Sequence, residues 1–286
     1  MKKTTPYFII LGILFTSCAP PIQVTRSRLM MGHVPVNISI RTSNQNEEKA
    51  LQASEEAYTL AQKLENKLSE YNSSSEISCL NQKAGKDFCT LSEETVRLLN
   101  LAQEINQKTE GAFDIRFPSL SEAGKKGMIL LLVNEGKLAN SQTRIGIASL
   151  AKGYILDQMV ELLQTKGFEA LVDAGGDIRA SGGPWKVAIQ IPGEDYGKNT
   201  SVFKIKDQAL TTSGNYENEK NIVDPKTSKP IQSKNAVSVI ATNATLANAL
   251  STALYVLGSS GNKIIHQNFS DIQIFWVNER GKIKKD

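Results

Sequence analysis

The feature that most constrains the fold of this chain is a pair of glycines set between two apolar runs. The largely apolar residues 171–174 and 178–180 enclose Gly175, Gly176 and Asp177. Adjacent glycines accept positive φ and let backbone N–H groups approach a ligand closely. The pattern predicts a strand, a tight turn and a second strand, with Asp177 able to accept hydrogen bonds from a ribose or a base. An ordinary hairpin turn has the same composition, so the turn alone does not define a site.

The other patterns in the chain predict a mixture of helices and strands. Residues 47–68 are expected to form a long helix, because apolar residues repeat at helical spacing with charges on the opposite face. A second helix is expected to open at Ser92. Alternating apolar residues predict strands at 34–40, 185–192 and 202–205, the last two in the same sheet as the glycine turn. With 286 residues, 40% of them hydrophobic, the chain can bury the core of one globular unit.

The N-terminus has the pattern of an export signal. A basic tip, residues 1–3, precedes an apolar run over residues 7–15 that is too short to span a membrane comfortably. Residues 15–18 (FTSC) resemble the bacterial lipoprotein cleavage box, in which Cys18 becomes the lipidated first residue. The alternatives are a conventional signal peptide cut nearby and an uncleaved anchor. The predicted parts of the chain are a lipoprotein signal peptide over residues 1–17, a tether over 18–28 and a folded domain over 29–286.

Charge and cysteine content exclude some classes of function. The net charge of +4 and the pI near 8.8 are mild, and the lysines are scattered, so nucleic-acid binding is not expected. If Cys18 carries lipid, Cys79 and Cys89 remain as a possible disulfide or as two packed thiols. These cysteines are not expected to bind a metal, because His33 and His266 are the only histidines.

Four further motifs accompany the glycine turn. They are residues 145–157 (IGIASLAKGYILD), 211–217 (TTSGNYE), 221–227 (NIVDPKT) and 247–254 (ANALSTAL). Together with the glycine turn they follow the order found in the ApbE family, the FAD:protein FMN transferases, which this chain resembles over most of its mature length. The resemblance implies an α+β fold, a single compact T-fold-related domain in which mixed and antiparallel sheets pack with helices.

The resemblance also implies a set of FAD-binding residues drawn from the whole chain. Tyr71 would contact a ring, because its aromatic face stacks and its phenol offers one hydrogen bond. Asp114 lies in an apolar setting, where burial demands a partner such as a ribose hydroxyl or a backbone N–H. Lys152 would reach the dinucleotide, because helix-start N–H groups and an ammonium both favour phosphate. The implied set is Met31, Tyr71, Ala112, Phe113, Asp114, Lys152, Gly175, Gly176, Asp177, Ser213, Gly214 and Ile222.

A magnesium site is implied by the same resemblance. Its ligands would be the backbone oxygen of Ser149 and the side chains of Asn248 and Thr252. The family has Asp at the position of Asn248, four residues before the threonine, so that both side chains face the metal from one side of a helix. An amide oxygen is a weaker ligand than a carboxylate, so a lower affinity for Mg²⁺ is expected.

The catalytic residues implied are Lys152, Asn221 and Asp224, and they include a departure from the family. Asn221 replaces a His that is the expected proton acceptor for the incoming hydroxyl, and Asn cannot perform acid–base chemistry. Gly146 replaces an acidic residue three positions before Ser149, which removes one flavin contact. Two alternatives to the transferase are therefore kept open. One is an FAD pyrophosphatase, in which water replaces the protein hydroxyl, and the other is a catalytically weakened flavin-binding lipoprotein.

The activity implied by the resemblance is magnesium-dependent transfer of FMN from FAD to a Thr or Ser of a partner protein, with release of AMP. The charge of the pyrophosphate would be neutralised by Mg²⁺ and Lys152 while the reacting groups are held in line. The expected acceptors are membrane redox subunits with an exposed Thr or Ser motif. The expected location is the periplasmic face of the bacterial inner membrane, with a lipid anchor at Cys18.

Overall fold

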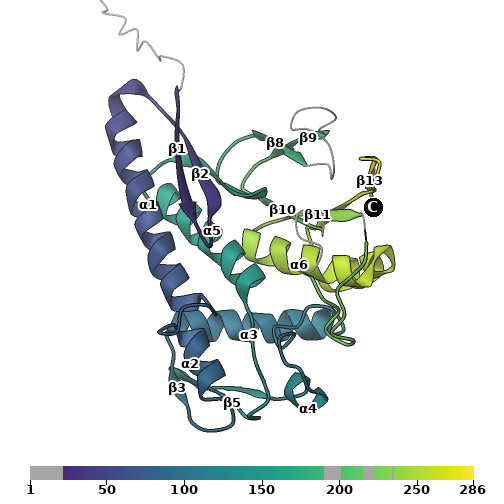
Figure 1. The fold of residues 1–286 in the computed structure, drawn as a ribbon. Helices are drawn as coiled ribbons and strands as arrows, with labels where there is room; N and C mark the ends of the chain where they lie inside the picture. The colour runs from purple at the N-terminus through teal and green to yellow at the C-terminus, as the bar shows by residue number, and fades with distance from the viewer. Residues whose placement is uncertain (1–21, 190–200, 215–221, 234) are drawn as a thin grey trace, which may run out of the picture.

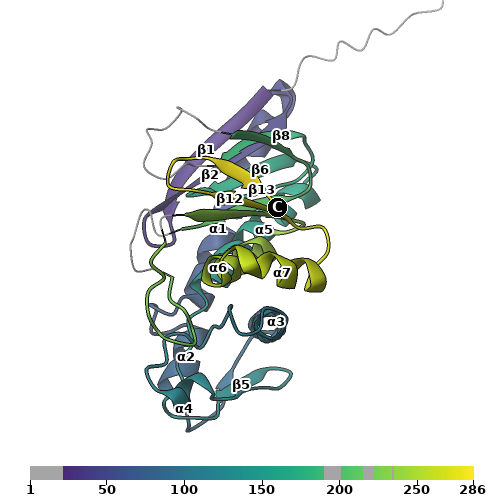
Figure 2. The same cartoon turned by 90° about the vertical axis from the view of Figure 1, so that its right-hand side faces the viewer.

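A computed structural model describes residues 22–189, 201–214, 222–233 and 235–286. The predicted signal peptide, Cys18 and Asn221 lie outside the described residues. Figures 1 and 2 show a large sheet, a layer of helices against one of its faces, and a smaller lobe beyond those helices. The α+β class predicted from the sequence is confirmed.

The central sheet has eight strands in the order β1-β2-β6-β7-β10-β11-β12-β13, each antiparallel to its neighbours. The strands are β1 (Ile22–Met30), β2 (Val34–Thr42), β6 (Glu169–Ala174), β7 (Asp177–Ala180), β10 (Ala209–Ser213), β11 (Ala236–Ala241), β12 (Gln273–Val277) and β13 (Ile283–Lys285). The predicted strand, glycine turn and strand are β6, its turn and β7, which pair from Leu171 with Ala180 to Ala174 with Asp177. The turn therefore belongs to a hairpin in the middle of the sheet.

Strand β1 corrects the predicted tether. Residues 18–28 were expected to be a polar linker, but residues 22–28 belong to β1, which pairs with β2 over its whole length. Only Val24 and Met30 of this strand are buried. Its sequence therefore lacks the apolar alternation by which a half-buried strand is identified, and pairing with β2 supplies what the pattern does not show.

The structure has two smaller sheets besides the central one. A three-stranded sheet is made of β3 (Cys89–Thr90), β5 (Glu135–Leu138) and β4 (Ile129–Leu131), and a two-stranded sheet is made of β8 (Trp185–Ile189) and β9 (Ser201–Ile205). The strands predicted at 185–192 and 202–205 thus exist where they are described, but their assignment to the sheet of the glycine turn is wrong. Their buried side chains pack instead against the face of the central sheet that carries Ile178, Leu210 and Phe275.

The helices are mostly those expected from the sequence. They are α1 (Glu47–Leu68), α2 (Glu76–Gln82), α3 (Glu93–Lys108), α4 (Glu122–Lys125), α5 (Ala148–Thr165), α6 (Ala244–Leu257) and α7 (Asn262–Asn268), with 3-10 turns at η1 (Asn44–Asn46) and η2 (Ser259–Gly261). Helix α1 has the predicted bounds. Helix α3 begins after Ser92 as predicted, with the Ser92 hydroxyl accepting a hydrogen bond from the N–H of Thr95. Side-chain caps of this kind are what make such sequence predictions work.

Helices α5 and α6 lie between two hydrophobic cores and position the site. One face of each packs with α1 against the central sheet, and the other face packs with α2 and α3 in the lower lobe (Figure 2). The two helices approach closely at Gly153, where an added Cβ would lie 2.4 Å from the carbonyl oxygen of Ala244. No larger residue fits this contact without moving backbone, so the start of α6 is set directly against α5.

The disulfide question left open by the sequence is answered by the fold. Cys79 of α2 and Cys89 of β3 form a disulfide that closes a segment with a sequence separation of 10. The bond joins α2 to the three-stranded sheet, and both elements belong to the core of the lower lobe. The lobe therefore has a covalent link in addition to its apolar packing.

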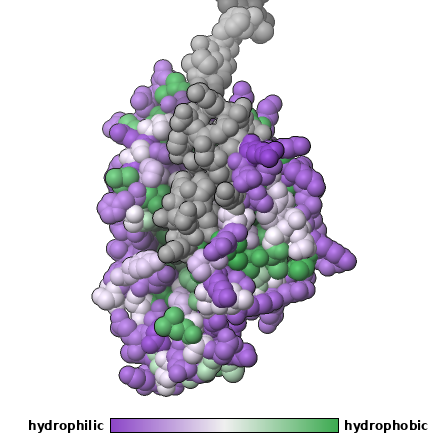
Figure 3. Space-filling model, turned by 45° about the vertical axis from the view of Figure 1, so that its right-hand side comes forward, coloured by the Kyte–Doolittle hydropathy of each residue, from purple (hydrophilic) through white to green (hydrophobic). Residues whose placement is uncertain are grey.

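The surface is largely polar. On the face drawn in Figure 3, hydrophilic side chains predominate and apolar groups form small separate patches. Large apolar side chains that are exposed include Leu120 and Val133. Within the described residues, no helix has the length and apolar character needed to cross a membrane.

Candidate functional site

The glycine turn between β6 and β7 is held in shape by Asp173. Gly175 and Gly176 have φ values of +64° and +90°, in the left-handed region that favours glycine. The Asp173 carboxylate accepts a hydrogen bond from the Gly176 N–H at 2.8 Å. Burial raises the pKa of the Asp173 carboxyl, and the Gly176 N–H and the nearby Lys152 ammonium act against that rise. A Cβ added to Gly176 would meet nothing within 4 Å, so this side of the turn is open to a ligand.

Three of the predicted site residues meet where β7 begins. The Nζ of Lys152 lies 2.8 Å from Oδ2 of Asp177, and the Nδ2 of Asn248 donates to the same oxygen at 2.9 Å. Asp177 and Asn248 are each only 7% exposed. Lys152 lies near the start of α5, Asn248 near the start of α6, and Asp177 follows the glycine turn. The arrangement fixes a positive charge beside an open turn, which suits a phosphate group.

The predicted metal ligands also lie near one another. Thr252 follows Asn248 by one helical turn and its hydroxyl donates to the backbone oxygen of Asn248 at 2.9 Å. Thr252 and Ser149 line the same cavity, which has a volume of about 140 Å³. Because the Asn248 amide nitrogen is directed at Asp177, its buried amide oxygen is left for another partner, and no described residue donates to it.

The oxygen donors at this place suit a hard cation. The described part of the chain contains no cluster of three or more His, Cys, Asp or Glu side chains that could hold a metal. An amide oxygen, a hydroxyl and a backbone carbonyl are ligands that Mg²⁺ or Ca²⁺ accepts, whereas softer metals prefer imidazole or thiolate. The residues present therefore fit Mg²⁺ by ligand type, with less negative charge than a carboxylate would give.

The same cavity gathers four of the twelve residues predicted to bind FAD. Ala112, Phe113, Asp114 and Ile222 line it, and Gly146 completes the wall on the side of α5. These residues come from the loop after α3, from the segment before α5 and from the loop that precedes β11. The structure thus brings together in one cavity residues that are more than a hundred positions apart in the sequence.

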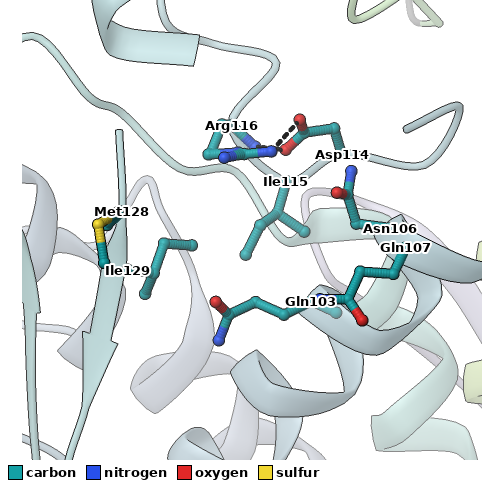
Figure 4. A pocket seen from close by; sticks show the side chains of 9 residues that line it. Gln103, Asn106, Gln107, Asp114, Ile115, Arg116, Met128 and Ile129 are labelled. Atoms are coloured by element: carbon teal, nitrogen blue, oxygen red, sulfur yellow. Dashed lines mark hydrogen bonds and ion pairs between the residues drawn. The ribbon is translucent and has the colours of Figure 1, made fainter. Parts of the chain in front are cut away.

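Asp114 does not offer a free carboxylate to that cavity. Its oxygens accept hydrogen bonds from Arg116, namely from the backbone N–H at 2.8 Å, from Nε at 2.9 Å and from Nη2 at 2.8 Å. Figure 4 shows this pair beside a neighbouring cavity of about 210 Å³ that is also lined by Gln103, Met128 and Ile129. The partner expected for the buried carboxylate is therefore a backbone N–H and a guanidinium, and Asp114 shapes the segment between the two cavities.

Ser213 lies in the buried network that joins β10 to α6. Its hydroxyl is 2.8 Å from that of Ser251, which donates to the backbone oxygen of Asn248 at 3.0 Å, and Thr211 donates to Ser251 at 3.3 Å. Ser213 thus acts on the candidate metal site through the helix that carries Asn248. Gly214 is the last described residue before the gap at 215–221.

Tyr71 and Met31 border the site from two other elements. Tyr71 is 86% exposed and lines a cavity of about 390 Å³ with Glu70, Ser78, Asn81 and Arg144. An exposed tyrosine ring can stack on a planar ligand. Met31 lies in the turn between β1 and β2, at the end of the sheet where Val34 lies against Gly175, and it packs on the core of the sheet.

Of the three predicted catalytic residues, Lys152 has the clearest place. Asp224 accepts hydrogen bonds from the N–H of Lys226 at 2.8 Å and from the hydroxyl of Thr227 at 3.0 Å, so it organises its own loop. Asn221 lies outside the described residues. Lys152 is therefore the one of the three whose contacts join it to the rest of the site.

Three residues at the site were missed by sequence reasoning. Glu70 accepts a hydrogen bond from the N–H of Ile147 at 2.8 Å, and the Asn81 side chain bonds both the N–H and the C=O of Ile145. Asp157 accepts hydrogen bonds from the first residues of α6. Each partner is at least 64 positions away, and a polar residue in a loop or on a helix gives no local signal of such a contact.

Relatives of known name match this chain over most of its length. A protein of Vibrio cholerae named FAD:protein FMN transferase is 27% identical over 86% of this chain and 85% of its own. Proteins of the same name from Haemophilus influenzae and Treponema pallidum are 29% and 27% identical, over 71% and 79% of this chain and 72% and 76% of their own.

Solved structures share the fold. The flavin transferase ApbE of Vibrio cholerae has a TM-score of 0.78 at 22% identity and covers 93% of this chain and 97% of its own. The apo flavinyl transferase ApbE of Pseudomonas stutzeri has a TM-score of 0.79 at 23% identity, with coverages of 94% and 95%. The model of the ApbE family matches residues 31–276, which include every site residue discussed above. This chain belongs to the ApbE family.

Proposed function

We propose that this protein is an FAD:protein FMN transferase. The observation that carries the proposal is the ammonium of Lys152, held 2.8 Å from Asp177 beside an open glycine turn and next to the oxygen donors of α6. A fixed cation beside an open turn is what a pyrophosphate needs. The name carried by its relatives, FAD:protein FMN transferase, supports the same activity.

In the proposed reaction a hydroxyl oxygen of the acceptor attacks the phosphorus next to riboflavin. The bond from that phosphorus to the bridging oxygen breaks, AMP leaves with the electron pair, and the hydroxyl proton passes to a base. Lys152 would neutralise charge on the pyrophosphate, and Asp177 would hold the ammonium in place. The negative charge of the transferring phosphoryl group stays on its oxygen atoms during the reaction. Positioning the reactants and neutralising that charge therefore supply most of the acceleration.

The residues that would hold Mg²⁺ are Ser149, Asn248 and Thr252. The fit rests on the buried amide oxygen of Asn248, to which no described residue donates, and on the hard oxygen chemistry of the set. When bound there, Mg²⁺ supplies Lewis-acid charge stabilisation to phosphate oxygens. The Asp177 carboxylate holds the orientation of the Asn248 side chain. A hydrogen bond to the backbone of α6 holds the Thr252 hydroxyl.

The acceptor and the location belong to the same proposal. We propose that the acceptor is a membrane redox subunit with an exposed Thr or Ser, and that the protein works at the periplasmic face of the inner membrane through a lipid on Cys18. The cleavage-box pattern at residues 15–18 supports the anchor. Labelling cells with a fatty-acid probe and finding the label on wild type but not on the Cys18→Ala variant would support it, and unlabelled wild type would contradict it.

The transferase is tested by mass spectrometry of a purified acceptor domain with an exposed Thr, incubated with FAD, Mg²⁺ and the chain lacking residues 1–18. The expected result is an added FMN on that Thr, lost with EDTA and lost with Lys152→Ala. The matched control is Lys166→Ala, because Lys166 follows the opposite end of α5 from Lys152 and is ion-paired with Glu56. Equal losses in both variants would contradict the role of Lys152.

The same experiment separates the two alternatives. FAD split to FMN and AMP without an adduct would favour the pyrophosphatase, which needs no base for an acceptor hydroxyl; the Asn at position 221 is the feature that keeps this alternative open. FAD that stays bound and intact would favour a flavin-binding lipoprotein. Neither outcome is compatible with the transferase.

A further inference from the structure

A half-buried carboxylate that the proposed reaction does not use lies between two of the cavities. Glu70 follows α1 and lines the cavity of about 390 Å³, and its Oε2 lies 2.9 Å from the place where a Cβ on Gly146 would be. Gly146 in turn lines the cavity that holds Ser149 and Thr252. The carboxylate of Glu70 therefore sits at the junction of the two cavities.

The Glu70 carboxylate and a side chain at position 146 cannot occupy the same space. A side chain at 146 would meet the Glu70 carboxylate at 2.9 Å and the Phe117 ring at 3.0 Å, so the glycine leaves the space that Glu70 occupies. The family resemblance places an acidic side chain at 146. In this chain a carboxylate is present at the same point in space, but it arrives from residue 70, on the far side of the cavity wall.

The protein leaves part of this carboxylate free. The N–H of Ile147 donates to it at 2.8 Å, and the N–H of Ala148 and the phenol of Tyr71 are near enough to favour its charged form. An ionised carboxylate offers about four lone-pair positions, so one remains for a ligand. The ring of Tyr71, which follows Glu70 in the chain, lines the same cavity and is 86% exposed, offers a stacking surface beside it.

We propose that Glu70 is a flavin-recognition residue of this protein, whose carboxylate accepts a hydrogen bond from the imide N–H of the isoalloxazine ring. The inference rests on the proposed function, since it needs a flavin at this site. The imide is the only ring N–H of an oxidised flavin, and the other N–H donor of FAD is the amino group of adenine. A carboxylate accepts from an imide N–H, whereas a glutamine in its place would present either an amide donor or its one oxygen.

The substitution Glu70→Gln separates recognition from helix capping. One amide oxygen can still accept the N–H of Ile147, but the amide nitrogen cannot accept the imide N–H. The matched control is Glu76→Gln, because the Glu76 carboxylate also accepts a backbone N–H just before a helix, that of Ser92 at 3.0 Å, away from these cavities. A purely structural role predicts equal effects for the two variants.

The measurement is the dissociation constant of FAD, FMN and ADP for wild type and both variants, by quenching of flavin fluorescence and by competition. The expected result for Glu70→Gln is a loss of about 10- to 100-fold for FAD and FMN, as for a hydrogen bond to a charged group, with no change for ADP. Glu76→Gln should bind all three as wild type does. Unchanged FMN binding by Glu70→Gln, a loss confined to ADP, or an equal loss in Glu76→Gln would each overturn the assignment.

Substitutions at positions 70 and 146, alone and combined, provide a second test of the proposal. Gly146→Asp alone should weaken FMN binding, because its Cβ meets Glu70. Glu70→Ala with Gly146→Asp should bind FMN more tightly than either single variant, since the carboxylate then returns from the other side. Independent effects of the two substitutions would contradict the proposal. Wild type that binds neither FAD nor FMN would instead contradict the proposed function, so the two failures are distinguishable.

Discussion

Helices α5 and α6 lie side by side, and at the start of each a carboxylate arrives from another element. At α6 it is Asp157, which accepts hydrogen bonds from the N–H groups of Ala244 and Thr245 at 2.8 and 2.9 Å and from the Thr245 hydroxyl at 2.6 Å. At α5 it is Glu70, which accepts from Ile147 at 2.8 Å. Burial raises the pKa of both carboxyls.

The two helix starts differ in what surrounds the carboxylate. Asp157 is also paired with Arg179 at 3.1 Å, and α6 has its own cap in Asn243, whose side chain accepts from Leu246. Helix α5 has Ile147 at its cap position and no side-chain cap. The start of α6 is thus held by its own side-chain cap and by an ion-paired carboxylate, and it borders a cavity of about 500 Å³. The start of α5 has no side-chain cap and borders two cavities. The difference indicates that the carboxylate at the start of α6 is more fully engaged by protein groups than the one at the start of α5.

The largest effect is expected at the start of α6. Asp157→Ala removes the acceptor of three hydrogen bonds and leaves Arg179 without its carboxylate, so the free energy of unfolding should fall by about 3 kcal/mol. Asp157→Asn, which keeps one acceptor oxygen, should lose less. Urea unfolding of the chain lacking residues 1–18 measures both. A loss below about 1 kcal/mol for Asp157→Ala would remove the contrast between the two starts.

The next largest effect is expected from removing the disulfide, which tests the support of the start of α5. Cys79 lies in α2, and Asn81 of the same helix holds Ile145 just before α5. The variant Cys79→Ser/Cys89→Ser should lower the free energy of unfolding by about 2 to 3 kcal/mol, as for a loop of this length. FAD binding should weaken as well, because a wall of the Tyr71 cavity loses its link. FAD affinity that stays at the wild-type value would show that α2 does not support the start of α5.

A smaller effect is expected from restoring a carboxylate on α6. Asn248→Asp would place a second carboxylate about 3 Å from Asp177, where Asn248 now donates at 2.9 Å. The affinity for Mg²⁺ should rise about tenfold, and stability in EDTA should fall, because two close carboxylates repel without a cation. Calorimetric titration with Mg²⁺ and unfolding in EDTA give the two readouts. No change in Mg²⁺ affinity would contradict the metal assignment.

The smallest effect is a pH dependence at Glu70. Its carboxyl has a raised pKa in the folded state, mainly through burial, so it binds a proton more readily folded than unfolded. Its contribution to stability is therefore present below the unfolded pKa and lost as the pH rises through the folded pKa. Glu70→Gln does not titrate, so its stability relative to wild type should rise as the pH is raised above the unfolded pKa of the Glu70 carboxyl, by less than about 1 kcal/mol because the group is partly solvated. Asp157→Asn should change in the same direction. A difference that is constant with pH in both variants would contradict the shifts.

Much of the framework follows from local sequence. The bounds of α1 and the cap of α3 come from helical periodicity and from Ser92, and the β6–β7 hairpin follows from Gly175 and Gly176. These features are set by neighbours within a few residues. Local patterns also place the strands β8 and β9, but not the sheet to which they belong, because alternation states which face is buried and not which partner is paired.

The site is harder to predict from the sequence than the framework, because its contacts join residues that are far apart in the chain. The family resemblance brings Lys152, Asp177 and Asn248 forward as residue types, but the shared oxygen of Asp177 on which the other two meet is a product of the fold. Glu70 carried no signal, since its contact with Ile147 spans 77 positions and its own segment reads as a polar loop. The sequence predicts a lost flavin contact at Gly146, and only the fold shows that the Glu70 carboxylate lies 2.9 Å from where a Cβ on that residue would be.

The close approach at Gly153 has a consequence for how such a protein can vary. Backbone meets backbone there, with an added Cβ only 2.4 Å from Ala244, so α5 cannot slide along α6 to accommodate a change at the site. Substitutions at positions such as 146 and 248 therefore change a functional group while the spacing between α5 and α6 stays the same. A lineage can trade a carboxylate for an amide, or supply it from another loop, without realigning the helices that carry the lysine and the threonine.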